Sequence, residues 1–145
     1  MFWRKKKEEA KVSPMNVLGQ TLISLPVFKY EIVVRFVDDM VSGIMQSGFS
    51  ESEAKYHKDA AGVFFPAPNS QEPWADAIFI FHGSGEKTLG NCAHEASHAV
   101  RSILTRRGVA LDDEVVAYHI GYITEQMAQL WGEVETRRRS ALSKK

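Results

Sequence analysis

The chain has 145 residues, of which 44% are hydrophobic and 25% are charged, and its 18 basic and 18 acidic side chains leave no formal net charge. This composition is typical of one globular domain with a modest core, and the zero net charge argues against a nucleic-acid or acidic-lipid binder. The single cysteine excludes an internal disulfide bond, which fits a reducing compartment.

Both ends of the chain are basic. Residues 1–15 include the run Arg4–Lys7 and lack hydrophobic periodicity, so we expect a flexible arm. Residues 137–145 are also basic and are expected to fray as a tail, which leaves residues 16–136 as the predicted folded domain. The start has no apolar segment of a secretory signal, and no apolar run approaches the length of a membrane span. We therefore expect no signal-directed secretion and no membrane partner.

The first half of the predicted domain has the patterns of two strands and two short helices. Val17–Leu25 consists of strand-type residues, and Lys29–Val37 alternates between two faces. Asp38 is placed to cap a short helix that Gly48 would end. Residues 50–53 form a capping box that predicts another short helix.

The second half predicts two more strands and two longer helices. Gly62–Pro66 and Ala75–His82 are the expected strands, with a proline-rich loop between them. A helix is expected from about Thr88 to Arg107 and is ended by Gly108. A last long helix follows, with Asp112 placed as its N-cap.

Residues 94–98 have the sequence His-Glu-Ala-Ser-His, an H-E-x-x-H motif. Histidines four residues apart lie one turn apart on the same side of a helix, where both can bind one zinc ion. Glu95 is then placed to take a proton from a metal-bound water. The apolar residues of this helix fall on its other side, whereas two ordinary core histidines would share the apolar stripe. Cys92 belongs to that stripe and is predicted to be a core residue rather than a ligand.

A catalytic zinc usually has three protein ligands and one open position. The last helix offers two candidates for the third ligand, Glu114 and His119. Glu114 shares a side of that helix with Ala117 and Gly121, whose small size would let the two helices approach closely. An acidic residue in a first turn is also favoured by the helix dipole alone. His119 lies nearer the apolar stripe and is expected either to support a ligand or to lie in the core.

Three further residues have two possible roles each. Asp113 would orient a histidine ligand, or it is an ordinary acid at a helix start. Tyr118 follows Glu114 by one turn and would stabilise a transition-state oxyanion, or it packs as a tyrosine without chemical function. His82 ends a predicted strand and would reach the substrate, although a lone histidine at a strand end usually has no chemical role.

The His-Glu-Ala-Ser-His motif at residues 94–98, followed by Asp-Asp-Glu-Val-Val-Ala-Tyr at residues 112–118, resembles the gluzincin pattern of small zinc metallopeptidases. The stretch 63–127 also resembles short H-E-x-x-H proteins of tailed bacteriophages and prophages. The resemblance implies one Zn²⁺ held by His94, His98 and Glu114, with Glu95 as general base. With the predicted elements, it implies an α+β, minimal zincin-like fold: a small sheet of three or four mainly antiparallel strands packed on the metal-binding helix and a long C-terminal helix.

These implications predict a zinc-dependent metallohydrolase, most simply a small metallopeptidase of phage or prophage origin acting on peptides or proteins. The alternative is a tail or assembly protein of a virion that keeps the zinc site without significant catalysis and contacts other virion proteins. Either protein would be found in the cytoplasm of the host cell or in the virion. For the peptidase, Ala75–His82 is predicted to offer an exposed edge to which an extended peptide can pair.

Overall fold

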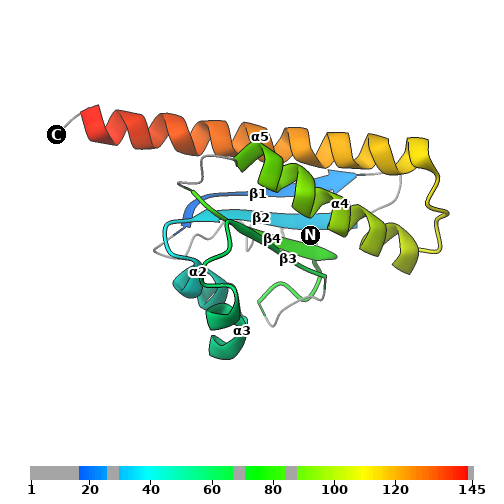
Figure 1. Cartoon of the computed structure of the whole chain (residues 1–145), viewed down its shortest axis with the longest axis horizontal. Helices are drawn as coiled ribbons and strands as arrows, with labels where there is room; N and C mark the ends of the chain where they lie inside the picture. Colours follow the sequence, from blue (N-terminus) through cyan, green and yellow to red (C-terminus); the bar gives the residue numbers. More distant parts are fainter. Residues whose placement is uncertain (1–16, 26–29, 67–70, 84–87, 144–145) are drawn as a thin grey trace, which may run out of the picture.

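The computed structural model describes residues 17–25, 30–66, 71–83 and 88–143. The arm predicted for residues 1–15 lies outside these ranges, as does the middle of the proline-rich loop. The described chain has an α+β fold, with a four-stranded sheet between two layers of helices (Figure 1). The predicted α+β class is therefore confirmed.

The sheet is mixed, with the strand order β1-β2-β4-β3. Its strands are β1 (Val17–Leu25), β2 (Tyr30–Val37), β3 (Gly62–Phe65) and β4 (Ala77–His82). β1 pairs with β2 and β3 with β4 in antiparallel fashion, whereas β2 and β4 are parallel. β4 thus lies inside the sheet, and the prediction that it forms an exposed edge is wrong. The strand beside it at the edge is β3.

The two central strands are buried on both faces. All eight residues of β2 are buried, and so are the first five of β4. This is the pattern of strands covered on both sides, where hydrophobic residues run almost continuously instead of alternating with polar ones. Glu31 and Arg35 are the charged exceptions in β2, and the guanidinium of Arg35 forms a buried ion pair with Glu72.

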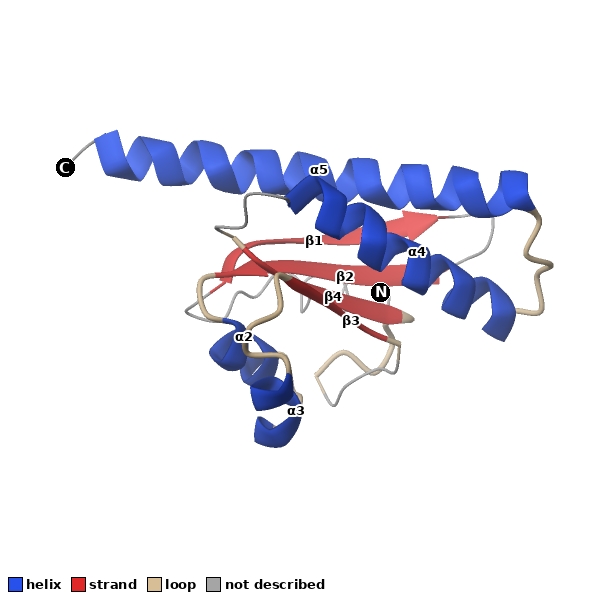
Figure 2. Cartoon of the chain, viewed as in Figure 1, coloured by secondary structure: helices blue, strands red, loops and turns tan. Residues whose placement is uncertain are grey.

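Two short helices cover one face of the sheet (Figure 2). α2 (Met40–Gln46) is capped by Asp39, which accepts a hydrogen bond from the amide of Ser42 at 2.8 Å. The predicted cap was Asp38, one residue earlier. α3 (Glu51–Tyr56) begins as predicted, because the Ser50 hydroxyl accepts the amide of Glu53 at 3.2 Å.

Two long helices cover the other face. α4 (Thr88–Arg106) ends before Gly108, which has the positive φ of 69° that glycine adopts readily. Asp112 caps α5 (Asp113–Ser143) as predicted, accepting the amide of Glu114 at 3.0 Å. The helix continues through the basic residues after 136 to Ser143, where a tail was predicted. α5 runs along the whole sheet and projects beyond it at its C-terminal end (Figure 1).

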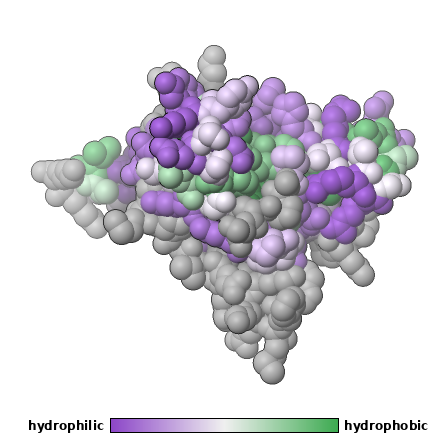
Figure 3. Space-filling view, turned by 90° about the horizontal axis from the view of Figure 1, so that it is seen from below, coloured by the Kyte–Doolittle hydropathy of each residue, from purple (hydrophilic) through white to green (hydrophobic). Residues whose placement is uncertain are grey.

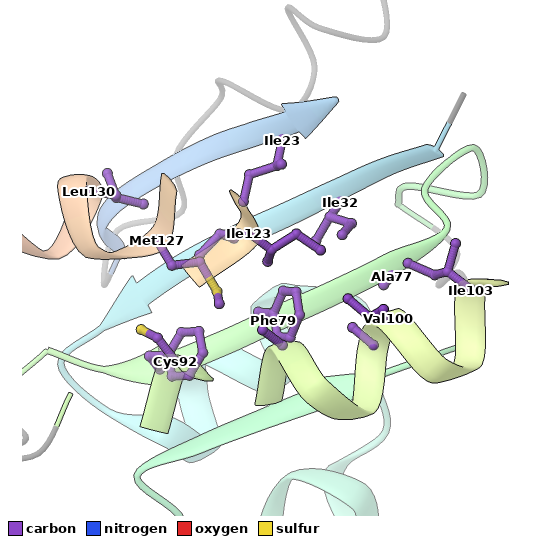
Figure 4. Packing of buried hydrophobic residues seen from close by; sticks show 14 of the residues in the cluster. Ile23, Ile32, Ala77, Phe79, Cys92, Val100, Ile103, Ile123, Met127 and Leu130 are labelled. Carbon is purple, nitrogen blue, oxygen red and sulfur yellow. The ribbon is translucent and has the colours of Figure 1, made fainter. Parts of the chain in front are cut away.

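The sheet separates two hydrophobic clusters. The larger one lies under α4 and α5, where Cys92, Val100 and Ile103 of α4 face Ala77 and Phe79 of β4 (Figure 4). The smaller one lies under α2 and α3. On that side of the molecule, hydrophilic residues border a central hydrophobic stretch (Figure 3). Among the described helices, none has the length and apolar character needed to cross a membrane.

Candidate metal centre

α4 has a buried side and an exposed side, and the H-E-x-x-H motif is divided between them. The buried residues of this helix pack on β4, and Cys92 is among them as predicted. Burial raises the pKa of its thiol to about 12, so Cys92 stays protonated and is not a metal ligand. His94 and His98 lie on the exposed side. The helix therefore presents both imidazoles to solvent from a rigid, core-anchored backbone.

The two imidazoles lie next to each other on α4. The Nε2 atoms of His94 and His98 lie 3.2 Å apart, and the rings are nearly perpendicular, at 83°. In a tetrahedral zinc site with Zn–N bonds of about 2.0–2.1 Å, two nitrogen ligands are about 3.3–3.4 Å apart. The observed separation is within about 0.2 Å of that value, so the spacing of the two nitrogens matches that of a pair of zinc ligands.

Glu95 is half-buried beside this pair. Burial raises the pKa of its carboxyl group, and the nearby positive charges of His94, His98 and His57 act in the opposite direction. A raised pKa makes a carboxylate a better proton acceptor, which is the property that a general base uses.

His57 is a neighbour of Glu95 that sequence reasoning missed. It ends α3, where its amide donates to the carbonyl of Ala54 at 3.2 Å. Its ring stands edge-on to that of Phe65 in β3, with centroids 5.7 Å apart, and β3 contacts α4. A single histidine at the end of a short helix carries no motif, so only the fold shows that it lies near Glu95.

Glu114 lies on the exposed side of α5, roughly half a turn from the buried stripe of that helix. The expectation that small residues on this side let α4 approach closely is wrong, because a Cβ added at Gly121 would meet nothing within 4 Å. Within the described ranges, no three His, Cys, Asp or Glu side chains are gathered so as to hold a metal ion. The structure thus brings His94 and His98 together but does not add Glu114 to them.

The other predicted site residues are dispersed. His119 is buried, and its Nδ1 lies 2.7 Å from the hydroxyl of Tyr30, so it belongs to the core. Tyr118 is 65% exposed and stands edge-on to His119. Asp113 is exposed in the first turn of α5 and makes no hydrogen bond or ion pair with any described residue. His82 lines a separate cavity at the end of β4.

Comparisons of the chain with protein-family models, with curated proteins and with solved structures found no match. The resemblances to gluzincins and to phage proteins therefore stay predictions.

Proposed function

We propose that the protein is a zinc-dependent hydrolase that cleaves peptide bonds, with His94 and His98 as ligands of one zinc ion and Glu95 as general base. The observation that supports this most strongly is the 3.2 Å separation of the two Nε2 atoms on the exposed side of α4. An exposed pair leaves room for water and substrate, as a catalytic rather than a structural zinc requires. Glu114 is not included as a third protein ligand.

Each residue has a definite task in this proposal. Zinc, when bound, supplies Lewis-acid chemistry that lowers the pKa of water and polarises a carbonyl group. Glu95 accepts the proton of the attacking water and passes it to the leaving amine. His57 places a second source of positive charge near Glu95 and so favours its ionised form. β4 and its neighbours hold α4 in place through the buried side of the helix.

The substrate is proposed to pair with β3. This strand is at the sheet edge, contacts α4 and offers backbone groups on its outer side. An extended peptide added there would run beside the helix that carries the two histidines. This role replaces the one predicted for β4, which is enclosed by β2 and β3.

A cleavage assay with matched variants tests the proposal. The zinc-loaded full chain is incubated with a peptide library, with and without a chelator, and products are identified by mass spectrometry. We expect chelator-sensitive cleavage that Glu95→Gln abolishes while zinc stays bound, whereas His94→Ala loses both zinc and cleavage. Glu114→Gln is the matched control, because it makes the same chemical change on the exposed side of α5. Full activity in Glu95→Gln would refute the role of Glu95.

A second candidate function uses the same two histidines to hold zinc without catalysis. A zinc-holding scaffold without turnover, such as the predicted virion protein, would use the same His94–His98 pair. The same assay separates the two candidates: the scaffold binds zinc but shows no chelator-sensitive cleavage of any library peptide.

A further inference from the structure

The chain leaves the two parallel strands toward opposite faces of the sheet. β2 is followed by α2 and α3, which pack on one face, whereas β4 is followed by α4, which packs on the other (Figure 2). β2 and β4 are neighbours, and their C-terminal residues Val37 and His82 are in register. In open sheets with parallel strands, ligands bind in the crevice that such a divergence leaves beyond the carboxyl ends of the strands.

A cavity of about 300 Å³ lies at this point. Its walls come from four elements of the chain: Leu18 of β1, Asp38 after β2, His82 of β4 and Arg138 of α5. None of these residues belongs to the proposed zinc site. The volume is at the small end of the range for ligand pockets and equals that of about ten water molecules in the liquid.

The cavity walls are held in place by backbone contacts. Arg138 donates from Nη1 to the carbonyl of Gly83 at 2.8 Å, which fixes α5 over the end of β4. The amide of Gly83 donates to the carbonyl of Val37 at 2.9 Å and so holds the two strand ends together. A Cβ added at Gly83 would lie 2.4 Å from Leu18, so the glycine lets Leu18 pack closely. Arg138, Leu18 and the two strand ends are thus held in place around the cavity.

The charges around the cavity favour a ligand that is itself neutral overall but carries both signs. Arg138 offers a guanidinium that is shared with Glu135 at 3.0 Å and is partly exposed, at 39%. Asp38 offers a carboxylate that makes no hydrogen bond or ion pair with the described part of the chain. One guanidinium against two carboxylates disfavours a dianion such as a phosphate ester. A carboxylate beside Arg138 and an ammonium beside Asp38 would pair both groups.

We infer that the cavity between the ends of β2 and β4 is a binding site for a small zwitterion, namely an α-amino acid with a short aliphatic side chain. The amino-acid carboxylate contacts Arg138 and its ammonium contacts Asp38. The aliphatic side chain packs against Leu18. This inference is independent of the proposed zinc chemistry, since the two sites share no residue.

Titration of the ¹⁵N-labelled full chain, followed by NMR, tests the inference. The probes are L-alanine, propionate, ethylamine and inorganic phosphate, each added to about 10 mM, which would largely saturate a site with a Kd of about 1 mM. We expect the shift of the Gly83 amide to approach saturation with L-alanine and to stay far from saturation with the other three probes. Propionate lacks the ammonium and ethylamine lacks the carboxylate, so the Kd of each should be at least about tenfold higher than that of L-alanine.

Two lining variants and two matched controls complete the test. Asp38→Asn and Arg138→Gln should each weaken L-alanine binding about tenfold or more. Asp59→Asn and Arg139→Gln make the same chemical changes at exposed positions outside the cavity and should leave binding unchanged. Arg138→Lys keeps the positive charge at this position. It therefore separates loss of the contact with the ligand carboxylate from loss of folding. The inference is overturned if L-alanine gives no saturable shift, if propionate binds equally well, or if phosphate binds more tightly.

Discussion

Replacing His98 by alanine should abolish most of the stabilisation that zinc gives to the folded protein. The His98 side chain is exposed, so its removal from the metal-free protein should change the free energy of unfolding by no more than about 0.5 kcal/mol. Zinc present at 100 times its Kd stabilises the folded state by about 2.7 kcal/mol. Each kcal/mol shifts the Tm of a chain of this size by about 2–4 °C, so the wild-type Tm should rise by about 5–11 °C.

The variant should respond far less. A structural zinc site with four ligands binds with about 10–16 kcal/mol, or about 3 kcal/mol per ligand, so losing one imidazole weakens binding about 100-fold. At the same zinc concentration the ion is then at its Kd and contributes about 0.4 kcal/mol, or about 1–2 °C. Thermal melts followed by circular dichroism, with and without zinc, measure the difference. His82→Ala should keep the wild-type response, because His82 lines another cavity. A zinc-dependent Tm rise in His98→Ala that equals the wild-type rise would refute the paired-ligand geometry.

Four further predictions concern stability. Glu72→Gln should lower the free energy of unfolding, measured by urea denaturation, by about 3 kcal/mol, because Arg35 is then buried without a charged partner. A loss below about 1 kcal/mol would contradict this. Replacing both Arg35 and Glu72 by methionine should restore most of the lost stability. Burial lowers the pKa of His119 in the folded protein, so the unfolded chain binds this proton first as the pH falls below about 6.5. The free energy of unfolding should therefore decrease below that pH, and the contribution of His119 is fully retained above it. The decrease between pH 7.5 and 5 should be smaller in His119→Gln, and an unchanged decrease would exclude His119 as its source. Gly62→Ala should destabilise by about 1–3 kcal/mol, because the new Cβ would lie 2.4 Å from a phenylalanine ring. Gly121→Ala should instead stabilise the protein by about 0.5–1 kcal/mol, since nothing lies within 4 Å of a Cβ added there on α5. If thermal melts showed both glycine variants shifting the Tm in the same direction, helix propensity and packing would not explain the two effects.

The helix ends were predictable because their signals are local. Ser50, Asp112 and Gly108 each act within a few residues of themselves, so the sequence around them is sufficient. The cap of α2 was displaced by one residue, because Asp38 and Asp39 have the same side chain and only the backbone decides which one accepts the amide of Ser42.

Relations between distant segments were not predictable in the same way. β2 and β4 pair across two intervening helices and a strand, and no local pattern shows that β4 lies inside the sheet. A helical wheel shows which residues of α5 share a side, but not how the helix is turned relative to α4. Glu114 was therefore predicted beside the histidines from its side of the helix and from the resemblance, whereas packing of the stripe from Val116 to Val134 turns it outward.

The metal centre shows the same division. The spacing of His94 and His98 along one helix places the two rings next to each other, so the pair could be identified from the motif alone. His57 comes near Glu95 only through the fold, because α3 and α4 are separate elements that pack on opposite faces of the sheet. Tertiary contacts of this kind leave no periodic signal in the sequence.

The contact between β1 and α5 has a consequence for the order of folding. Gly19 lies against Val134, and Ile23 packs with Ile123 and Met127, so the first described strand depends on the last helix (Figure 4). Contacts so far apart along the chain slow folding, because a long loop must close before they form. During synthesis, the apolar side of β1 and β2 stays uncovered until α5 has left the ribosome. The nascent chain therefore completes this layer only after that helix has been translated.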